Sequence, residues 1–257
     1  MHSLKNKIVF ITGASSGIGA SCAKEFARLG ARLLLCARRI DRLQSKAESL
    51  KKEYGCDIHV FQLDVRKQKD VQAAMKTLPK EWKDIYLLLN NAGLARGFEP
   101  FHEADINDWE EMIDTNIKGL LYVSRAVIPG MIARGGGHII NIGSIAGRQV
   151  YPKGNVYCAT KHAVGALTQA LRLDLNGTSI RVSTVDPGLV ETEFSIVRFH
   201  GDKNRADKTY EGMTPLTPGD IADAVIYCAT RPPHVNIQEV LIMPTDQASV
   251  GVVHRKK

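Results

Sequence analysis

Short apolar runs alternate with helical patterns along most of this 257-residue chain, and this alternation constrains the fold more than any other feature. The first run, residues 7–12 (KIVFIT), is β-branched and apolar, which is typical of a strand buried on both faces. Further strands are expected at 32–37, 57–61, 85–89, in a run ending at 144, at 180–185 and at 238–243. Because helical patterns separate most of them, the sequence predicts an α/β fold with a doubly wound parallel sheet.

The sequence predicts one domain, with neither a leader nor a membrane span. No linker or repeat divides the chain, and 44% hydrophobic and 24% charged residues suffice for one core, so we expect a single domain over 1–257. No signal-like stretch opens the chain, and no run approaches the roughly 18 apolar residues of a bilayer span. The five cysteines are scattered without a C-x-x-C pair, which favours reduced thiols and a cytoplasmic location.

Composition also argues against metal and nucleic-acid ligands. The eight histidines show no metal-ligand spacing, so no metal site is expected. A net charge of +7 favours anionic partners weakly, and the basic residues are spread among helices, so we expect no nucleic-acid partner. The final trio, Arg255, Lys256 and Lys257, is interpreted as a solvated tail.

A glycine-rich turn follows the first expected strand and opens the first helical pattern. Its glycines would let the backbone turn sharply and approach a pyrophosphate, whose charge a helix N-terminus stabilises. Because a glycine-rich turn alone is weak evidence, its placement between the first strand and the first helix carries the inference. The predicted dinucleotide-binding turn comprises Gly13, Ser15, Ser16, Gly17, Ile18 and Gly19.

Two arginines follow the second expected strand. In a dinucleotide-binding unit this strand end faces the adenosine ribose, where an acid would bind the 2′-hydroxyl of NAD and an arginine accommodates a 2′-phosphate. Arg38 lies 19 positions after Gly19, which fits that place. Arg38 and Arg39 therefore predict NADP as the cofactor, the alternative being that they only begin a solvated helix at 40–54.

Further small and polar residues lie at the ends of later strands, where ligands collect in open parallel sheets. Asp64 could hold an adenine amino group or only cap the following helix, and Thr192 is placed to reach a nicotinamide amide. The motif NNAG could form the floor of the cofactor site and brace a neighbouring strand, or it could form only a turn. The set at these strand ends comprises Asp64, Val65, Asn91, Ala92, Gly93, Pro187, Gly188, Val190 and Thr192.

The pair Tyr157 and Lys161 predicts an acid/base group. At i and i+4 they share one face of a helix expected at 155–175. An ammonium within about 4–6 Å lowers the pKa of a phenol from its usual value near 10. Ser144, at the end of the preceding strand, could hydrogen-bond the substrate oxygen that Tyr157 protonates or deprotonates. The alternative is an ordinary pair on a surface helix.

Two other features need an explanation beyond packing. Asn116 interrupts the apolar face of a long helix expected to open near Asn107, and a buried amide is either braced by backbone or placed for function. The segment at about 191–215 is polar and long, which is typical of a lid over a binding site.

Together these motifs resemble the short-chain dehydrogenase/reductase family. The resemblance rests on TGASSGIG, NNAG, Asn116, Ser144 thirteen residues before Tyr157, the Tyr-x-x-x-Lys pair and Pro187-Gly188. It implies a single Rossmann-type doubly wound sheet of seven strands in the order 3-2-1-4-5-6-7. It also implies a catalytic tetrad of Asn116, Ser144, Tyr157 and Lys161, with Tyr157 and Lys161 also contacting the cofactor. The family further implies a homotetramer, with the helices near 107 and 155 at its interfaces.

A narrower resemblance, carried by GSIAGRQVYPKGNVYCATK, PGLVETEFSIVRFHGD and MPTDQA, is to the NADP-dependent 3-hydroxy acid dehydrogenases. That group implies a small anionic hydroxy acid or aldehyde as substrate, in the class of serine, L-allo-threonine and malonic semialdehyde. The substrate would contact Ser144 and Tyr157, and Arg148 and Arg198 are candidates to bind its carboxylate. Two alternatives stay open, a carbonyl reductase of bulkier neutral or thioester substrates and an NADP-binding module without activity.

Overall fold

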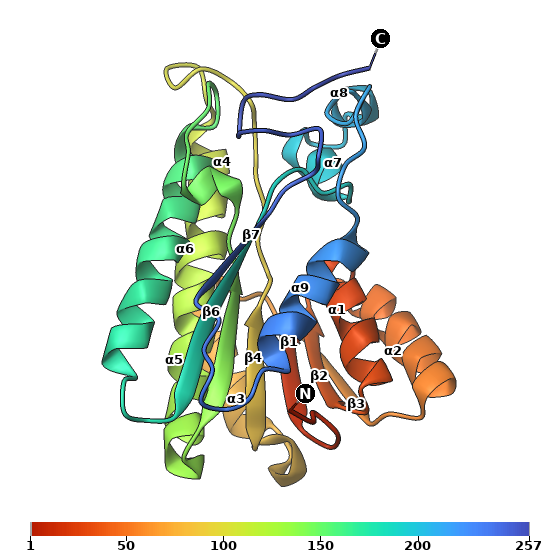
Figure 1. Cartoon of the computed structure of the whole chain (residues 1–257), viewed down its shortest axis with the longest axis vertical. Coiled ribbons are helices and arrows are strands. Elements are labelled where there is room, and N and C mark those ends of the chain that lie inside the picture. Colours follow the sequence, from red (N-terminus) through yellow and green to blue (C-terminus); the bar gives the residue numbers. More distant parts are fainter. Residues whose placement is uncertain (1, 257) are drawn as a thin grey trace.

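The computed structural model describes residues 2–256 and contains one seven-stranded parallel sheet (Figure 1). Its strand order is β3-β2-β1-β4-β5-β6-β7, which confirms the predicted topology. The strands are β1 (Ile8–Thr12), β2 (Arg32–Ala37), β3 (Ile58–Gln62), β4 (Ile85–Asn90), β5 (Gly137–Ile142), β6 (Ile180–Pro187) and β7 (Glu239–Ile242). The inner strands β1, β5 and β6 are buried along their whole length, as continuous apolar runs require in a sheet covered on both faces.

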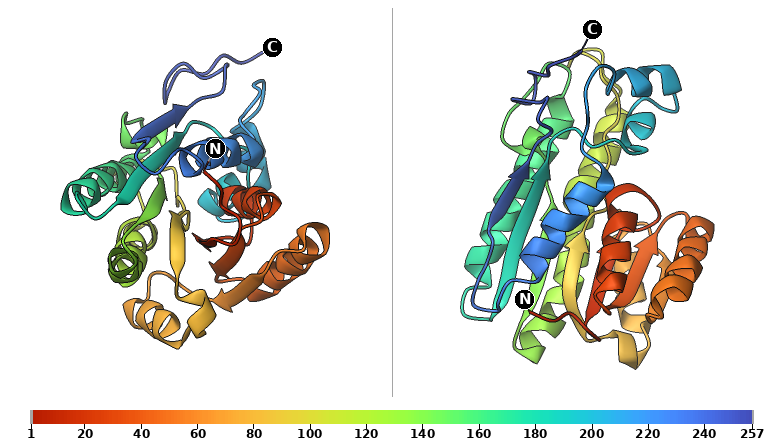
Figure 2. Two further views of the ribbon diagram at one scale, coloured as in Figure 1. Left: turned by 60° about the horizontal axis from the view of Figure 1, so that its bottom comes forward. Right: turned by 45° about the vertical axis from the view of Figure 1, so that its right-hand side comes forward.

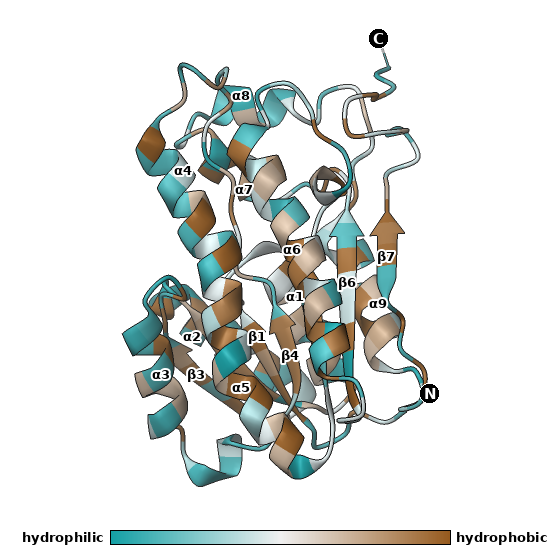
Figure 3. Ribbon diagram, turned by 90° about the vertical axis from the view of Figure 1, so that its left-hand side faces the viewer, coloured by the Kyte–Doolittle hydropathy of each residue, from teal (hydrophilic) through white to brown (hydrophobic). Residues whose placement is uncertain are grey.

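Helices cover both faces of the sheet (Figures 1 and 2). One face carries α1 (Gly17–Arg28), α2 (Ile40–Tyr54) and α9 (Pro218–Ala229), whose apolar side chains share one core cluster. The other carries α3 (Gln68–Thr77), α5 (Leu120–Arg134) and α6 (Asn155–Asp174), with a second cluster beneath them. In Figure 3 the strands β1, β3 and β4 are coloured mainly as apolar, and polar residues recur along the helices that face the viewer. No helix within residues 2–256 is both long and apolar enough to cross a membrane.

The long helix expected to open near Asn107 is divided in three. Asp105 is its N-cap and accepts a hydrogen bond from the backbone N–H of Asn107. The segments are α4 (Ile106–Ile113), a π-helical stretch (Asp114–Gly119) and α5. Asn116 lies in the π-helical stretch, a geometry that often occurs at functional sites.

The order of winding reverses between β1 and β4, which lie side by side at the centre of the sheet. In open α/β sheets ligands bind beyond the carboxyl ends of the strands at such a switch point. Two short helices, α7 (Phe194–Arg198) and α8 (Lys203–Lys208), lie at this end together with the C-terminal segment (Figures 1 and 3).

Candidate active site

A cleft of about 930 Å³ opens at the carboxyl ends of the strands. Except for Gly19, every residue predicted to bind the cofactor lines it. Of the predicted tetrad, Ser144, Tyr157 and Lys161 line the cleft and Asn116 does not. The cleft therefore joins the predicted dinucleotide site and the predicted acid/base group in one continuous space.

The glycine-rich turn has the geometry that its residues predict. Gly13 and Gly17 have φ of +66° and +54°, a conformation that side chains rarely adopt. Gly19 lies behind the cleft, where a Cβ atom would come 2.6 Å from the Gly13 carbonyl oxygen. Asn91 donates hydrogen bonds to the carbonyl oxygens of Thr12 (2.9 Å) and Gly13 (3.2 Å). Asn91 thus braces β1 and the turn from β4, so that the N-terminus of α1 faces the cleft.

The arginines after β2 are held by carboxylates on other elements. Arg38 Nη1 lies 3.3 Å from Glu111 Oε1. Arg39 donates to Ser16 Oγ at 2.8 Å and to Glu193 at 2.9 Å, and Arg42, on α2, donates to Glu193 at 2.9 Å. All three guanidinium groups remain about half exposed, so they can exchange these partners for a ligand.

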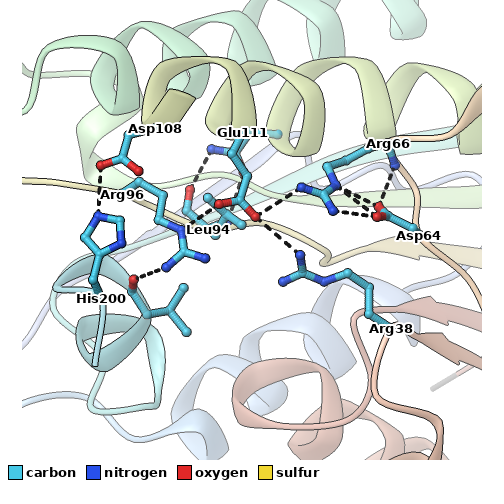
Figure 4. Close-up of polar contacts among 10 residues, drawn as sticks. Arg38, Asp64, Arg66, Leu94, Arg96, Asp108, Glu111 and His200 are labelled. Atoms are coloured by element: carbon cyan, nitrogen blue, oxygen red, sulfur yellow. Dashed lines mark hydrogen bonds and ion pairs between the residues drawn. The ribbon is translucent and has the colours of Figure 1, made fainter. Parts of the chain in front are cut away.

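Glu111, on α4, joins three segments that follow three different strands (Figure 4). Besides Arg38, Glu111 pairs with Arg66, which follows β3, at an N–O distance of 3.1 Å. It also pairs with Arg96, which follows β4, at 2.7 Å. Burial alone would raise the pKa of Glu111, but the hydrogen bond and charge of Arg96 and the charges of Arg66 and Arg38 hold it below its usual value. Arg96 also donates to the backbone carbonyl of Val197, in the 191–215 segment, at 2.6 Å. One carboxylate therefore connects the adenosine end of the cleft with the 191–215 segment.

Asp64 does not cap the following helix, because α3 begins at Gln68 with Lys67 at its N-cap. Its carboxylate instead forms a two-pronged ion pair with Arg66, with N–O distances of 2.6–3.0 Å. Burial opposes ionisation of Asp64, but the Arg66 hydrogen bonds lower the pKa overall. The capping interpretation was wrong, and Asp64 lies at the cleft as an ionised group.

Tyr157 and Lys161 lie on the first turns of α6, and both side chains are buried. Lys161 Nζ donates to the Ile142 carbonyl oxygen, at the end of β5, at 2.9 Å, and burial lowers its pKa to about 8. Burial raises the pKa of the Tyr157 phenol above its usual value, and a hydrogen bond with Ser144 and the charge of Arg198 offset only part of that rise. We expected Lys161 to lower the pKa of Tyr157. The pKa is raised instead, because the effect of burial is larger than that of the nearby charges. Tyr157 is held as a neutral phenol, which suits a proton donor.

Ser144 and Asn116 are fixed by backbone contacts. Ser144 Oγ accepts a hydrogen bond from the Ala146 N–H at 3.1 Å, which aims the hydroxyl at the cleft side of a short 3₁₀ turn. Asn116 binds both backbone groups of Leu94, accepting from its N–H at 2.9 Å and donating to its carbonyl at 2.8 Å. Of the two alternatives for Asn116, bracing by backbone is what the structure shows.

Arg198 lies beside the phenol. Its guanidinium carbon is 5.7 Å from the centre of the Tyr157 ring and 4.8 Å from that of Phe98. Nη1 donates to the Tyr151 hydroxyl at 2.9 Å, and Nε donates to the Gly97 carbonyl oxygen at 3.1 Å. These contacts use part of its hydrogen-bonding capacity and leave other N–H groups beside the cleft.

Arg148 lies outside the cleft lining. Its guanidinium pairs with Asp186 on β6 at 2.7 Å and with Glu239 on β7 at 2.6 Å. Two carboxylates therefore neutralise it, and of the two arginine candidates for a substrate anion only Arg198 faces the cleft.

Several residues at the substrate end of the cleft were not predicted from the sequence. Phe98 and Tyr151 come from irregular loops, and Gln247, Val253 and Arg255 come from the C-terminal segment. The solvated-tail interpretation was wrong for Arg255, which donates to the backbone carbonyls of Thr209 (3.1 Å) and Glu211. Lys256 is exposed but its N–H donates to the Gly212 carbonyl at 2.7 Å, and Lys257 lies outside the described residues.

The chain is similar to known proteins over nearly its whole length. Residues 7–202 match the family model described as short chain dehydrogenase. The NADP-dependent 3-hydroxy acid dehydrogenase YdfG of Salmonella typhi is 52% identical over 250 residues, which span 96% of this chain and 99% of that protein. The NADP-dependent 3-hydroxy acid dehydrogenase of Schizosaccharomyces pombe is 45% identical over 258 residues, 100% of both chains.

A solved structure agrees with these sequence matches. It is described as the closed form of serine dehydrogenase complexed with NADP+, and it superposes with a TM-score of 0.90 at 49% identity. The match covers 97% of this chain and 100% of that one. With the glycine-rich turn, the Ser144, Tyr157 and Lys161 arrangement and these matches together, the chain belongs to the short chain dehydrogenase family.

Proposed function

We propose that this protein is an NADP-dependent oxidoreductase that transfers hydride between NADP(H) and a small 3-hydroxy acid or its carbonyl form. The observation that carries this proposal is the position of Arg198, whose guanidinium lies 5.7 Å from the centre of the Tyr157 ring in the same cleft. At this spacing Tyr157 can exchange a proton with the hydroxyl or carbonyl oxygen of a small substrate while Arg198 binds the carboxylate of the same molecule. The 3-hydroxy acid dehydrogenases named above are its full-length relatives, which supports the same substrate class.

The adenosine end of the cleft fits NADP rather than NAD. Arg38 and Arg39 line this end of the cleft, and ion pairs through three carboxylates, Asp64, Glu111 and Glu193, connect them with Arg42, Arg66 and Arg96. The excess of two positive charges matches a phosphate monoester, which carries about −1.5 to −2 at neutral pH. A Cβ on Gly13 would meet Ala92 and Asn91 at 3.0 Å, so glycine at this position lets the turn pack closely against the end of β4.

Tyr157 would act as the acid or base at the substrate oxygen. In reduction the neutral phenol donates its proton to the carbonyl oxygen and becomes a phenolate, and in oxidation the phenolate form accepts the hydroxyl proton. Ser144, whose side chain lines the same cleft, would hold the same oxygen in place. When bound, the nicotinamide of NADP supplies or accepts the hydride. Lys161, which lines the same cleft beside Gly93, would contact the bound cofactor.

We further propose that residues 191–215 form a lid. This segment contains α7 and α8, and the Tyr210 hydroxyl hydrogen-bonds Ser195 within it (2.8 Å) and donates to the carbonyl oxygen of Val190, directly before it (2.8 Å). Arg198 lies at the end of α7, so a closed lid places a cation over the substrate and excludes water, which strengthens the ion pair.

The test is a panel of 3-hydroxy acids and their aldehydes, assayed with NADP(H) and NAD(H) by the absorbance of the reduced nicotinamide. We expect turnover of the acids with NADP+ and weaker turnover with NAD+. Activity on neutral alcohols alone would overturn the assignment. The aromatic side chains of Phe98, Phe194 and Phe199 at the substrate end favour one second candidate, reduction of bulkier carbonyls, and paired acid and neutral substrates of equal size separate the two.

We also propose a homotetramer in the cytoplasm. Apolar side chains are exposed on helices near 107 and 155, among them Ile106 (64%) and Leu173 (78%), and such surfaces are typical of subunit interfaces. The five cysteines are free thiols, which supports a reducing compartment. Light scattering on the purified protein measures the assembly directly.

A further inference from the structure

Glu193 forms ion pairs with two arginines on the opposite side of the cleft. Its Oε2 atom lies 2.9 Å from Arg39 Nη1, and its Oε1 atom lies 2.9 Å from Arg42 Nη1. The residue directly follows Thr192 and stands at the N-terminus of α7, so it belongs to the lid. Arg39 is the N-cap of α2, two residues after β2 ends, and Arg42 lies in the first turn of α2.

The arginines that Glu193 holds belong to the group that we assign to the 2′-phosphate of NADP. A carboxylate and a phosphate are alternative partners for the same guanidinium N–H groups, and they repel each other. We propose that Glu193 is a specificity-determining residue that opposes binding of the 2′-phosphate, so that it sets how strongly the protein prefers NADP(H) to NAD(H). This inference rests on the proposed cofactor and adds a residue that works against the arginines.

The exposure of these groups makes the competition reversible. Side-chain exposures are 43% for Arg39, 45% for Glu193 and 55% for Arg42, and exposed ion pairs are individually weak. The hydrogen bond from Arg39 and the charges of Arg39 and Arg42 lower the pKa of Glu193, so its carboxylate is ionised at neutral pH. Glu193 therefore keeps a full negative charge at the place that the phosphate must reach.

Glu111 provides a contrast. It also pairs with a phosphate-site arginine, Arg38, but it is only 20% exposed and holds Arg66 and Arg96 as well. Loss of Arg38 would leave Glu111 with two partners, whereas loss of Arg39 and Arg42 would leave Glu193 with none of its ion pairs among the described residues. When a phosphate binds these arginines, Glu193 therefore loses its ion pairs, whereas Glu111 keeps two of its three.

The experiment measures dissociation constants of NADPH and NADH on the full-length protein by the fluorescence of the reduced nicotinamide, without substrate. The variant is Glu193→Gln, which keeps the shape and removes the charge. The matched control is Glu191→Gln, which removes the same charge two residues away at an exposed position. Thermal unfolding followed by circular dichroism checks that both variants fold.

We expect Glu193→Gln to tighten NADPH binding by about 2- to 30-fold, the range for loss of two competing exposed ion pairs. NADH binding and both constants of Glu191→Gln should change by less than about twofold. The gain should shrink as salt is added, because exposed charges are screened. Unchanged or weaker NADPH binding in Glu193→Gln, or equal tightening of NADH, overturns the inference. If the wild-type protein itself shows no preference for NADPH over NADH, the proposed cofactor is wrong instead.

Discussion

Replacing Arg198 by alanine tests whether this arginine binds the substrate carboxylate. The guanidinium donates to the Gly97 carbonyl and the Tyr151 hydroxyl, and its remaining N–H groups are free to bind an anion at the cleft. Truncation removes the anion contact and also loosens the lid. The design must therefore separate the two effects.

The expected magnitude follows from the kind of contact that is lost. A hydrogen bond between a guanidinium and a carboxylate contributes about 1.5–3 kcal/mol, which is roughly 10- to 150-fold in kcat/KM. The loosened lid affects an acid and its neutral analogue alike, because Gly97 and Tyr151 lose the same partner with either substrate. The informative quantity is therefore the ratio of the two losses.

The assay compares 3-hydroxypropionate with 3-hydroxypropanamide, which have nearly the same size and differ by one charge. Arg198→Ala should lower kcat/KM for the acid by about 10- to 150-fold more than for the amide. Arg198→Lys keeps the charge but not the planar fork, so it should recover part of the acid activity. The reasoning fails if both variants lower acid and amide activity equally.

Three further predictions use other parts of the site. Tyr157→Phe should lower kcat by at least about 10²-fold while the dissociation constant of NADPH stays within about twofold, and substantial remaining turnover would exclude Tyr157 as the acid/base group. Arg38→Asp should weaken NADPH binding and leave NADH binding nearly unchanged, as titrations with both reduced cofactors would show. Glu111→Gln should lower the free energy of unfolding by about 1–3 kcal/mol, measured by urea denaturation at neutral pH, because three arginines lose a charged, partly buried partner. Since the folded protein lowers the pKa of Glu111 below its ordinary 4.5, this contribution is complete above pH 4.5 and disappears as pH falls through the lower folded value. The wild type and Glu111→Gln should therefore converge in stability at acid pH, and a constant difference would contradict the argument.

Much of the fold was predictable because its signals are local. The strand at 32–37 and the helix at 40–54 have the predicted bounds, since a continuous apolar run and a 3.6-residue period each specify one structure. At the start of α9, Thr217 forms a capping box with Asp220, again between residues only three positions apart. The glycine-rich turn was equally clear, because its conformation depends on residues adjacent in the chain.

The parts that were not predicted depend on contacts between distant residues. Arg148 was a candidate for the substrate anion, but its partners Asp186 and Glu239 lie 38 and 91 positions away, on two other strands. The role of Arg255 depends on carbonyl groups more than 40 residues earlier. Likewise, the pKa of Tyr157 depends on how deeply its ring is buried, which no spacing of Tyr157 and Lys161 reveals.

The ion pairs around Glu111, formed by Arg38, Arg66 and Arg96 together with Asp64, affect how cofactor preference can change during evolution. Without the Arg38 side chain, two arginines, Arg66 and Arg96, still face two carboxylates, Asp64 and Glu111, so the charges on these strand ends remain balanced. Removal of the Arg38 side chain therefore leaves each of these partly buried carboxylates with an arginine partner. Substitution of Arg38 can therefore change the preference between NADP and NAD during evolution. The ion pairs of Arg66 and Arg96 with Asp64 and Glu111 stay in place and continue to stabilise the fold.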